Sequence, residues 1–181
     1  WDFPVSVWET VMGGRYGHMR NDPLWRRLLP ARWYDPRHGE AVHRALEAVD
    51  MLALAKRPIG ALSGGQKKRV LLARTLAQQA NILLLDEPLA GVDPPSERLI
   101  LDVLAREREA GRTVIMVTHD MPGARRHVDH VVLINRFIRG VGAPDEMLSD
   151  AKLAELAVSS TEQSVYDMAA DKASSFTVAQ G

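Results

Sequence analysis

The stretch Leu62-Ser63-Gly64-Gly65-Gln66 stands before a run of residues with helical periodicity. Two glycines behind a hydroxyl residue let the backbone approach a ligand closely, and a helix start leaves N–H groups pointing outward, which favours phosphate binding. Ser63 and Gln66 also match the S-x-x-Q capping box, so a helix cap alone is the other interpretation. The residues downstream decide between the two interpretations.

Length and composition narrow the classes of protein. The chain has 181 residues, enough for one domain with a sizeable core. Its 23 basic and 23 acidic residues balance, so charge gives no indication of a nucleic-acid partner, and there is no cysteine for disulfide or thiol chemistry. No apolar run reaches the roughly 18 residues of a transmembrane helix, and no signal peptide is visible. Because the chain starts at Trp1 within a fully patterned stretch, we expect it to be a piece of a longer protein.

Alternating strand and helix patterns predict an α/β fold with a parallel sheet. Residues 82–85 and 113–117 are continuous apolar runs, typical of strands buried on both faces. A helix that opens at Pro94-Pro95 and stops at Gly111 lies between them. A third strand is predicted at 131–134, with a weaker indication that 137–141 pairs with it. Further helices are expected at 8–12, from 36 up to the stop at Arg57-Pro58, at 67–77, at 121–127 and within 144–157. Loop or broken helix is expected at 1–7 and 21–36.

Charged residues follow the predicted strands at the point where each strand ends. Asp86 and Glu87 come directly after the first strand, and His119 follows the second. In open parallel sheets this edge is where ligands bind. One carboxylate can hold Mg²⁺ through water while its neighbour takes a proton from an attacking water. A surface acidic pair and a structural histidine are the competing interpretations, and Lys67-Lys68-Arg69 is interpreted as a solvated helix face.

Four of these motifs, in this order and at close spacing, resemble those of ATP-binding cassette (ABC) ATPases. Residues 62–66 resemble the signature motif, and residues 82–87 resemble the Walker B strand with its following glutamate. Residues 89–93 resemble the D-loop, and residues 118–120 resemble the switch-histidine motif. The resemblance covers residues 1 to about 156. Within that family, residues 1–5 and 12–18 resemble importers of the manganese, zinc and iron type.

The resemblance implies a P-loop NTPase (ABC ATPase) fold with an inserted α-helical subdomain, of which this chain is the C-terminal portion. Residues 1–158 would form a partial ABC ATPase domain. Within it, about 21–78 would be the helical subdomain, and about 79–158 the Walker B and switch-histidine part of the α/β core. Residues 159–181 would be a polar C-terminal tail.

The resemblance also implies residue roles at two ATP sites formed by a head-to-tail dimer. Asp86 would hold Mg²⁺ through water, Glu87 would be the general base, and His119 would contact the γ-phosphate and position the water. Asp93 would link the two sites across the interface. The signature residues would touch the γ-phosphate held by the opposite subunit: Ser63, Gly64, Gly65 and Gln66.

The function that the resemblance implies is that of an ATP-binding and ATP-hydrolysing subunit that powers membrane transport of a divalent metal ion. ATP and Mg²⁺ would be its cofactors. Its partners would be a second ATPase subunit, a transmembrane permease that meets the face near residues 1–18, and a metal-binding substrate-binding protein, with no nucleic acid. Such a subunit would lie peripherally on the cytoplasmic face of the cell membrane.

One departure from the family pattern is large. The family needs a P-loop, G-x-x-x-x-G-K-[ST], and this chain contains no Gly-Lys pair. We expect the P-loop part to lie before Trp1 and the 181 residues alone to be inactive. Three alternatives stay open: a soluble ABC-type ATPase of translation, one of chromosome maintenance, or a non-catalytic piece that only pairs with an intact cassette. The single helix between Gln66 and Asp86 argues against the long coiled coils of chromosome proteins.

Overall fold

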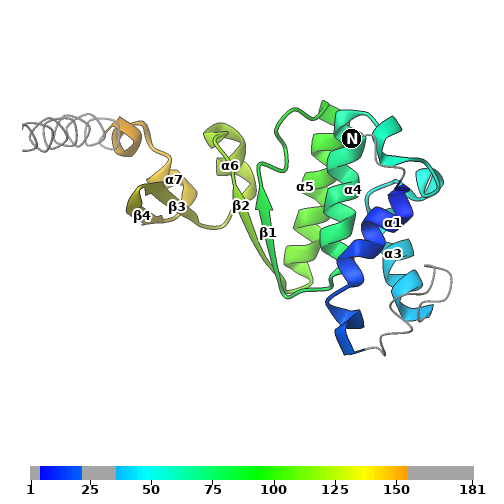
Figure 1. Cartoon of the computed structure of the whole chain (residues 1–181). Coiled ribbons are helices and arrows are strands. Elements are labelled where there is room, and N and C mark those ends of the chain that lie inside the picture. Colours follow the sequence, from blue (N-terminus) through cyan, green and yellow to red (C-terminus); the bar gives the residue numbers. More distant parts are fainter. Residues whose placement is uncertain (1–4, 22–35, 155–181) are drawn as a thin grey trace, which may run out of the picture. The chain divides into compact units, whose positions relative to one another are not determined.

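The computed structural model describes residues 5–21 and 36–154. These residues form two compact units that divide between His119 and Asp120, and each unit is described by itself (Figure 1). Three predictions lie wholly or largely outside the described residues: the loop at the start of the chain, the broken helix at 21–36 and the polar tail at 159–181.

Helices α1 (Val7–Met12), α3 (Pro36–Ala48) and α4 (Gly64–Ala77) pack against one another in the first unit. Helix α1 starts at a capping box in which Ser6 and Glu9 bond each other's backbone N–H groups. Helix α3 starts at Pro36, as predicted from Asp35-Pro36, and ends at Ala48, earlier than expected. Short 3-10 turns complete this part: Gly13–Arg15, His18–Asn21, Leu52–Leu54 and Ile59–Ala61.

Strands β1 (Ile82–Asp86) and β2 (Thr113–Val117) are parallel, with Ile82 opposite Thr113 and Asp86 opposite Val117. Helix α5 (Pro94–Glu109) connects them, and the chain then turns at Gly111, whose φ is +83°. This β–α–β unit confirms the predicted parallel pairing. The two strands stop level with each other, which places residues 86–87 beside residues 117–119.

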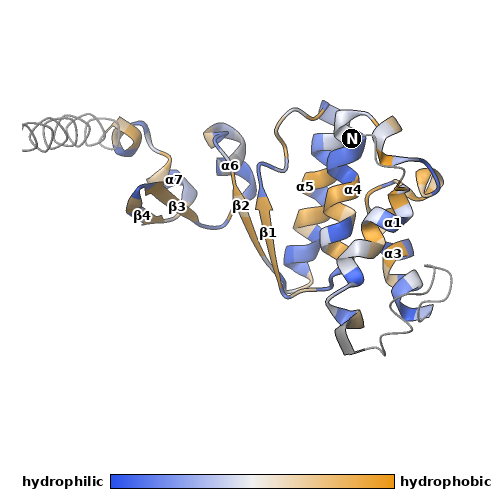
Figure 2. Ribbon diagram, in the orientation of Figure 1, coloured by the Kyte–Doolittle hydropathy of each residue, from blue (hydrophilic) through white to orange (hydrophobic). Residues whose placement is uncertain are grey.

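The structure contradicts the prediction that these strands are buried on both faces. Leu83 and Leu85 are buried, whereas Ile82 and Leu84 are 59% and 69% exposed, and β2 alternates between exposed and half-buried residues. Figure 2 shows the apolar character of both strands. The physical reason is that helix α5 packs against the sheet from one side, while the described residues of this unit leave the other face open to solvent.

The core of the first unit lies between the helices and the covered face of β1. Its largest fully buried side chains come from helices, turns and strand alike: Val7, Val11, Val42, Leu46, Val49, Met51, Val70, Leu83 and Ile100. Burying side chains of this size contributes about 1.5–3 kcal/mol each. Helix α4, which begins at the signature motif, is therefore anchored on several sides.

Arg15 fastens the far end of α4. Its Nη1 donates to the Ala77 carbonyl oxygen at 2.6 Å and to Gln79 Oε1 at 2.8 Å, and its Nε donates to His38 Nδ1 at 3.2 Å. Burial, and then the charge of Arg44, lower the pKa of Arg15. A cation at a helix C-terminus satisfies carbonyl groups that have no intrahelical partner. Helix α4 is thus held at its end as well as along its length.

The second unit contains helix α6 (Met121–His127), strands β3 (Val131–Asn135) and β4 (Phe137–Gly142), and helix α7 (Pro144–Met147). The two strands pair antiparallel through a turn at Arg136, whose φ is +56°, so the weakly indicated hairpin is confirmed. Strands β3 and β4 form a two-stranded antiparallel sheet within this unit. A small core of Leu133, Met147 and Leu148 supports it.

Candidate active site

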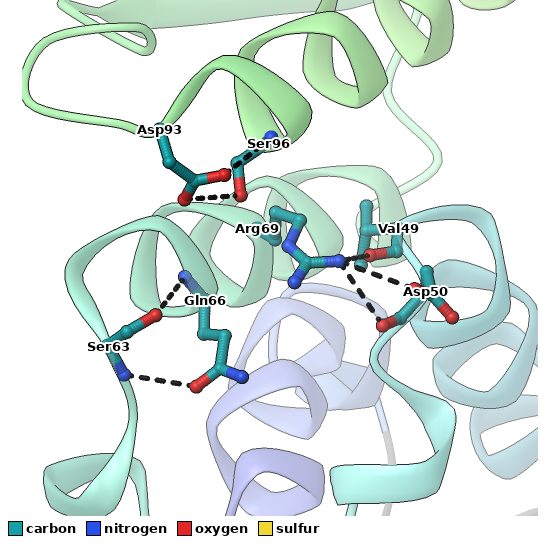
Figure 3. Close-up of polar contacts among 7 residues, drawn as sticks. All are labelled: Val49, Asp50, Ser63, Gln66, Arg69, Asp93 and Ser96. Atoms are coloured by element: carbon teal, nitrogen blue, oxygen red, sulfur yellow. Dashed lines mark hydrogen bonds and ion pairs between the residues drawn. The ribbon is translucent and has the colours of Figure 1, made fainter.

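The N-terminal turn of α4 is closed by hydrogen bonds within four residues (Figure 3). The Gln66 N–H donates to Ser63 Oγ at 3.3 Å, and the Ser63 N–H donates to Gln66 Oε1 at 3.0 Å. This is the capping box that the S-x-x-Q spacing predicts. Ser63 and Gly64 are exposed, so the positive end of the helix dipole reaches the surface at the signature motif.

Gly65 lies against the first turn of α5. A Cβ on Gly65 would collide with Asp93 Oδ2 and would lie 2.8 Å from Ser96 Oγ. Because this approach leaves no room for a side chain, glycine is required here for packing, independently of any ligand. The start of the signature helix and the end of the predicted D-loop therefore touch within one chain, which sequence reasoning did not anticipate.

Asp93 caps helix α5. Its Oδ1 accepts from the Ser96 N–H at 3.0 Å and its Oδ2 accepts from the Ser96 hydroxyl at 3.0 Å (Figure 3). These hydrogen bonds, the backbone one first, hold the pKa of Asp93 below its ordinary value. The carboxylate is thus ionised and fixed in direction, and it lies exposed at the surface.

Glu87 turns sharply away from the end of β1. Its φ is +45°, a left-handed conformation that costs an ordinary residue about 1–2 kcal/mol. The Glu87 N–H still donates to the Val117 carbonyl oxygen at 2.9 Å, so the parallel ladder extends one residue beyond Asp86. Uncommon backbone conformations of this kind concentrate at functional sites.

His119 meets the Glu87 carboxylate. The His119 N–H donates to Glu87 Oε1 at 3.1 Å, and His119 Nδ1 lies 2.7 Å from the same oxygen. The Glu87 side chain is 32% exposed and the His119 side chain is 83% exposed, so the pair faces solvent. The structure therefore brings Asp86, Glu87 and His119 to one edge of the sheet, where a base and a phosphate-contacting group could act on the same substrate.

Lys68 and Arg69 do not form the solvated helix face that the sequence suggested. Lys68 Nζ donates to the Glu87 carbonyl oxygen at 2.7 Å. Arg69 Nη1 donates to the Val49 and Asp50 carbonyl oxygens at 3.3 and 3.4 Å and lies 3.6 Å from Asp50 Oδ2 (Figure 3). Their position on the side of α4 that faces neighbouring elements explains the difference, and nothing in their spacing signals it.

The donor set at the strand ends fits a magnesium ion that keeps most of its waters. Asp86 supplies an exposed carboxylate at the end of β1, and Mg²⁺ is commonly held by one or two carboxylates together with substrate phosphates. Among residues 5–21 and 36–154, no group of three or more His, Asp or Glu side chains is arranged to hold a metal ion by itself. Within the same residues, no helix is long and apolar enough to cross a membrane.

Comparison with known proteins identifies a family that has this fold. The ABC transporter family model matches residues 5–90. The manganese transport system ATP-binding protein MntA of Synechocystis sp. is 40% identical over 153 residues, which are 84% of this chain and 55% of that protein.

The chain belongs to the ABC transporter ATPase family.

Two further members of the ABC family show the extent of the likeness. The chelated iron transport protein YfeB of Yersinia pestis is 44% identical over 142 residues, 78% of this chain and 45% of that protein. A solved metal-chelate type ABC transporter in an inward-facing conformation superposes with a TM-score of 0.71 at 26% identity, over 84% of this chain and 58% of that one. The fold is accordingly that of an ABC ATPase cassette. The chain spans about half the length of the curated relatives it matches.

The ABC family match includes only part of the candidate site. Residues 63–66 and 86–87 lie within the matched region 5–90, whereas Asp93 and His119 lie beyond it. The assignment of His119 to the site is supported by the structure, in which His119 Nδ1 lies 2.7 Å from Glu87 Oε1. The assignment of Asp93 is supported by its contacts with Gly65 of the signature turn and with Ser96.

Proposed function

We propose that this chain is part of the ATP-binding and ATP-hydrolysing subunit of an ABC transporter that moves a divalent metal ion across the membrane. The observation that carries the proposal is the cluster at the strand ends, where Glu87 and His119 share a short contact directly after Asp86. A base beside a group that can sense a phosphate is the arrangement that ATP hydrolysis requires.

Within this site, Glu87 takes the proton of the attacking water, and its carboxylate accepts the bonds that fix His119. His119 contacts the γ-phosphate and orients the water. Asp86 would hold Mg²⁺ through water, and the ion would supply positive charge to neutralise the phosphate oxygens. The exposure of both Glu87 and His119 leaves room for the nucleotide and water to approach.

The signature turn acts on the nucleotide of a second subunit. The side chains of Ser63 and Gln66 bond each other's backbone N–H groups, whereas the Glu87 carboxylate bonds His119. No side-chain hydrogen bond therefore joins the signature residues to the Glu87 carboxylate, which is compatible with their acting at different nucleotides of a head-to-tail dimer. Ser63, Gly64, Gly65 and Gln66 meet the partner's γ-phosphate through the helix N-terminus, and Asp93 links the two sites.

The remaining partners follow from the transport role. A transmembrane permease receives the face near residues 1–18, and a metal-binding substrate-binding protein delivers the ion. The subunit lies peripherally on the cytoplasmic face of the cell membrane. The metal-ion class is supported by the names of the relatives, which include manganese and chelated-iron transport proteins.

The 181 residues by themselves are proposed to be inactive. No Gly-Lys pair occurs in the sequence, so no P-loop lysine can hold the β- and γ-phosphates. Without a bound phosphate, Glu87 and His119 have no substrate to act on.

The function is tested by transport in proteoliposomes that contain the full-length subunit, its permease and the binding protein. We expect uptake of Mn²⁺ that needs ATP and that stops in the Glu87→Gln variant. Zinc, ferrous iron and a non-metal solute serve as competing substrates. ATP hydrolysis that is not stimulated by any metal-loaded binding protein would exclude metal transport while leaving the ATPase role intact.

A further inference from the structure

We propose that Lys68 is a positioning residue for the general base Glu87. The inference rests on the proposed function, because it assigns a role relative to the base of that site. Its central observation is the 2.7 Å hydrogen bond from Lys68 Nζ to the Glu87 carbonyl oxygen, which joins helix α4 to the turn that follows β1. A charged donor makes a stronger hydrogen bond than a neutral one.

The backbone of Glu87 needs such support. Its φ of +45° is a conformation that non-glycine residues rarely adopt, and it persists only where surrounding contacts impose it. Both polar groups of this residue's backbone are bonded. The N–H donates to the Val117 carbonyl oxygen at 2.9 Å, and the carbonyl oxygen accepts from Lys68 at 2.7 Å and, at the longer distance of 3.3 Å, from the Ala90 N–H of its own turn. Together they set the direction in which the Glu87 side chain leaves the backbone.

The direction of the Glu87 side chain determines whether its carboxylate reaches His119 and the attacking water. Glu87 Oε1 accepts from the His119 N–H and lies 2.7 Å from His119 Nδ1. A shift of the Glu87 backbone moves this oxygen away from His119 and from the water it deprotonates. Misplacement of a reacting group by about 1 Å can lower a rate by about 10²-fold.

Helix α4 makes Lys68 a fixed donor. Gly65, Val70 and Leu72 of this helix are buried, and Arg15 holds its last carbonyl group. The neighbouring Lys67 is half-buried to a similar extent, but its side chain makes no hydrogen bond or ion pair with the residues that the structure describes. Lys67 is therefore the matched control.

The experiment measures ATP hydrolysis, thermal unfolding and ATP binding for variants of the full-length protein. Lys68→Met should lower kcat by about 10–100-fold while KM for ATP and Tm stay at the values of Lys67→Met. Lys68→Arg should recover most of the rate, because guanidinium can donate to the same carbonyl. In the Glu87→Gln background, Lys68→Met should cause no further loss, because a residue that acts through Glu87 has nothing left to position.

Three results would overturn the proposal. They are a kcat for Lys68→Met equal to that of Lys67→Met, a loss of kcat matched by a fall in Tm or ATP affinity, and additive losses in the double variant. Normal hydrolysis by Glu87→Gln would instead remove the base and with it the proposed mechanism. A slow Glu87→Gln with a normal Lys68→Met would reject only the positioning role.

Discussion

The N-terminal turn of α4 and the carboxyl ends of β1 and β2 hold their polar groups in different ways. In the turn, Ser63 and Gln66 bond each other across three positions of sequence. At the strand ends, Glu87 depends on Lys68, 19 residues before it, and on His119, 32 residues after it. The turn is thus a local structure, whereas the strand-end site exists only when α4 and both strands are packed together.

This difference has a consequence for substitutions. Changes in the core should disturb the strand-end site before they disturb the turn, because only the former combines contacts from three elements. The turn should respond mainly to changes in its own four residues and in the α5 cap that Gly65 touches. Variants of single residues can therefore separate the two regions.

The largest loss of ATP hydrolysis is expected when no P-loop is present to bind the phosphates. Residues 1–181 alone should show no Mg-ATP hydrolysis above the level of a Glu87→Gln control, because the proximity contribution lost is about 7–11 kcal/mol of the barrier. Addition of a P-loop-containing part should restore turnover. A purified 181-residue chain that hydrolyses ATP faster than its Glu87→Gln variant would contradict this prediction.

Glu87→Gln should have the next largest effect. In the full-length protein we expect kcat to fall about 10²–10⁴-fold, the usual contribution of a positioned general base, while ATP binding stays intact. Steady-state hydrolysis and equilibrium nucleotide binding measure the two quantities. An unchanged kcat would remove Glu87 from the role of base, and Asp86→Asn would then show whether the metal position alone supports turnover.

Strand β1 offers a direct comparison of packing. Leu83→Ala should lower the free energy of unfolding by about 2–5 kcal/mol, because the Leu83 side chain is 2% exposed. Ile82→Ala should have a much smaller effect in residues 1–181, because Ile82 is 59% exposed. Urea denaturation of both variants checks the contrast. If a further segment covers this face in the full-length protein, the cost of Ile82→Ala should rise there.

The local structures were predictable from sequence, and the reason is geometric. Three helix ends are set by the residues that stand there: the S-x-x-Q motif at Ser63, Pro94-Pro95 and Gly111. The identity of the strand-end residues Asp86, Glu87 and His119 also followed from where the apolar runs stop. These features depend on neighbours within a few positions.

Contacts between elements were not predictable in the same way. Nothing in the sequence Lys67-Lys68-Arg69 indicates that Lys68 donates a hydrogen bond to Glu87 while its neighbour Lys67 does not. The requirement for Gly65 comes from Asp93 and Ser96, which lie on another helix. The exposed Ile82 and Leu84 show the same limit, since burial depends on what covers a strand and not on the strand's own composition.

Ser63→Arg should separate the turn from the strand ends. A bulky cation at this exposed position should weaken ATP-driven dimerisation by about 10–100-fold, comparable to overpacking of an interface, and should spare ATP binding to the monomer. Ser63→Thr keeps the hydroxyl cap and is the control. ATP-dependent dimers of Ser63→Arg in size-exclusion chromatography, at the concentrations at which Ser63→Thr dimerises, would contradict the assignment.

The smallest expected effect is the loss of stability at low pH when Asp93, the N-cap of α5, becomes protonated. Because hydrogen bonds from Ser96 lower the pKa of Asp93 below 3.8, the stability that this carboxylate contributes is present above that pH and is lost as pH falls through the lowered pKa. Ser96→Ala removes the hydroxyl donor, so the pKa should rise toward 3.8 and the loss should begin at a higher pH. NMR titration of the Asp93 carboxylate measures the shift directly. Asp93→Asn keeps a capping side chain without a titrating group, and the stability difference between wild type and Asp93→Asn should shrink only below about pH 4. If that difference were constant down to pH 3, titration of Asp93 would not contribute to the stability of the turn that Gly65 packs against.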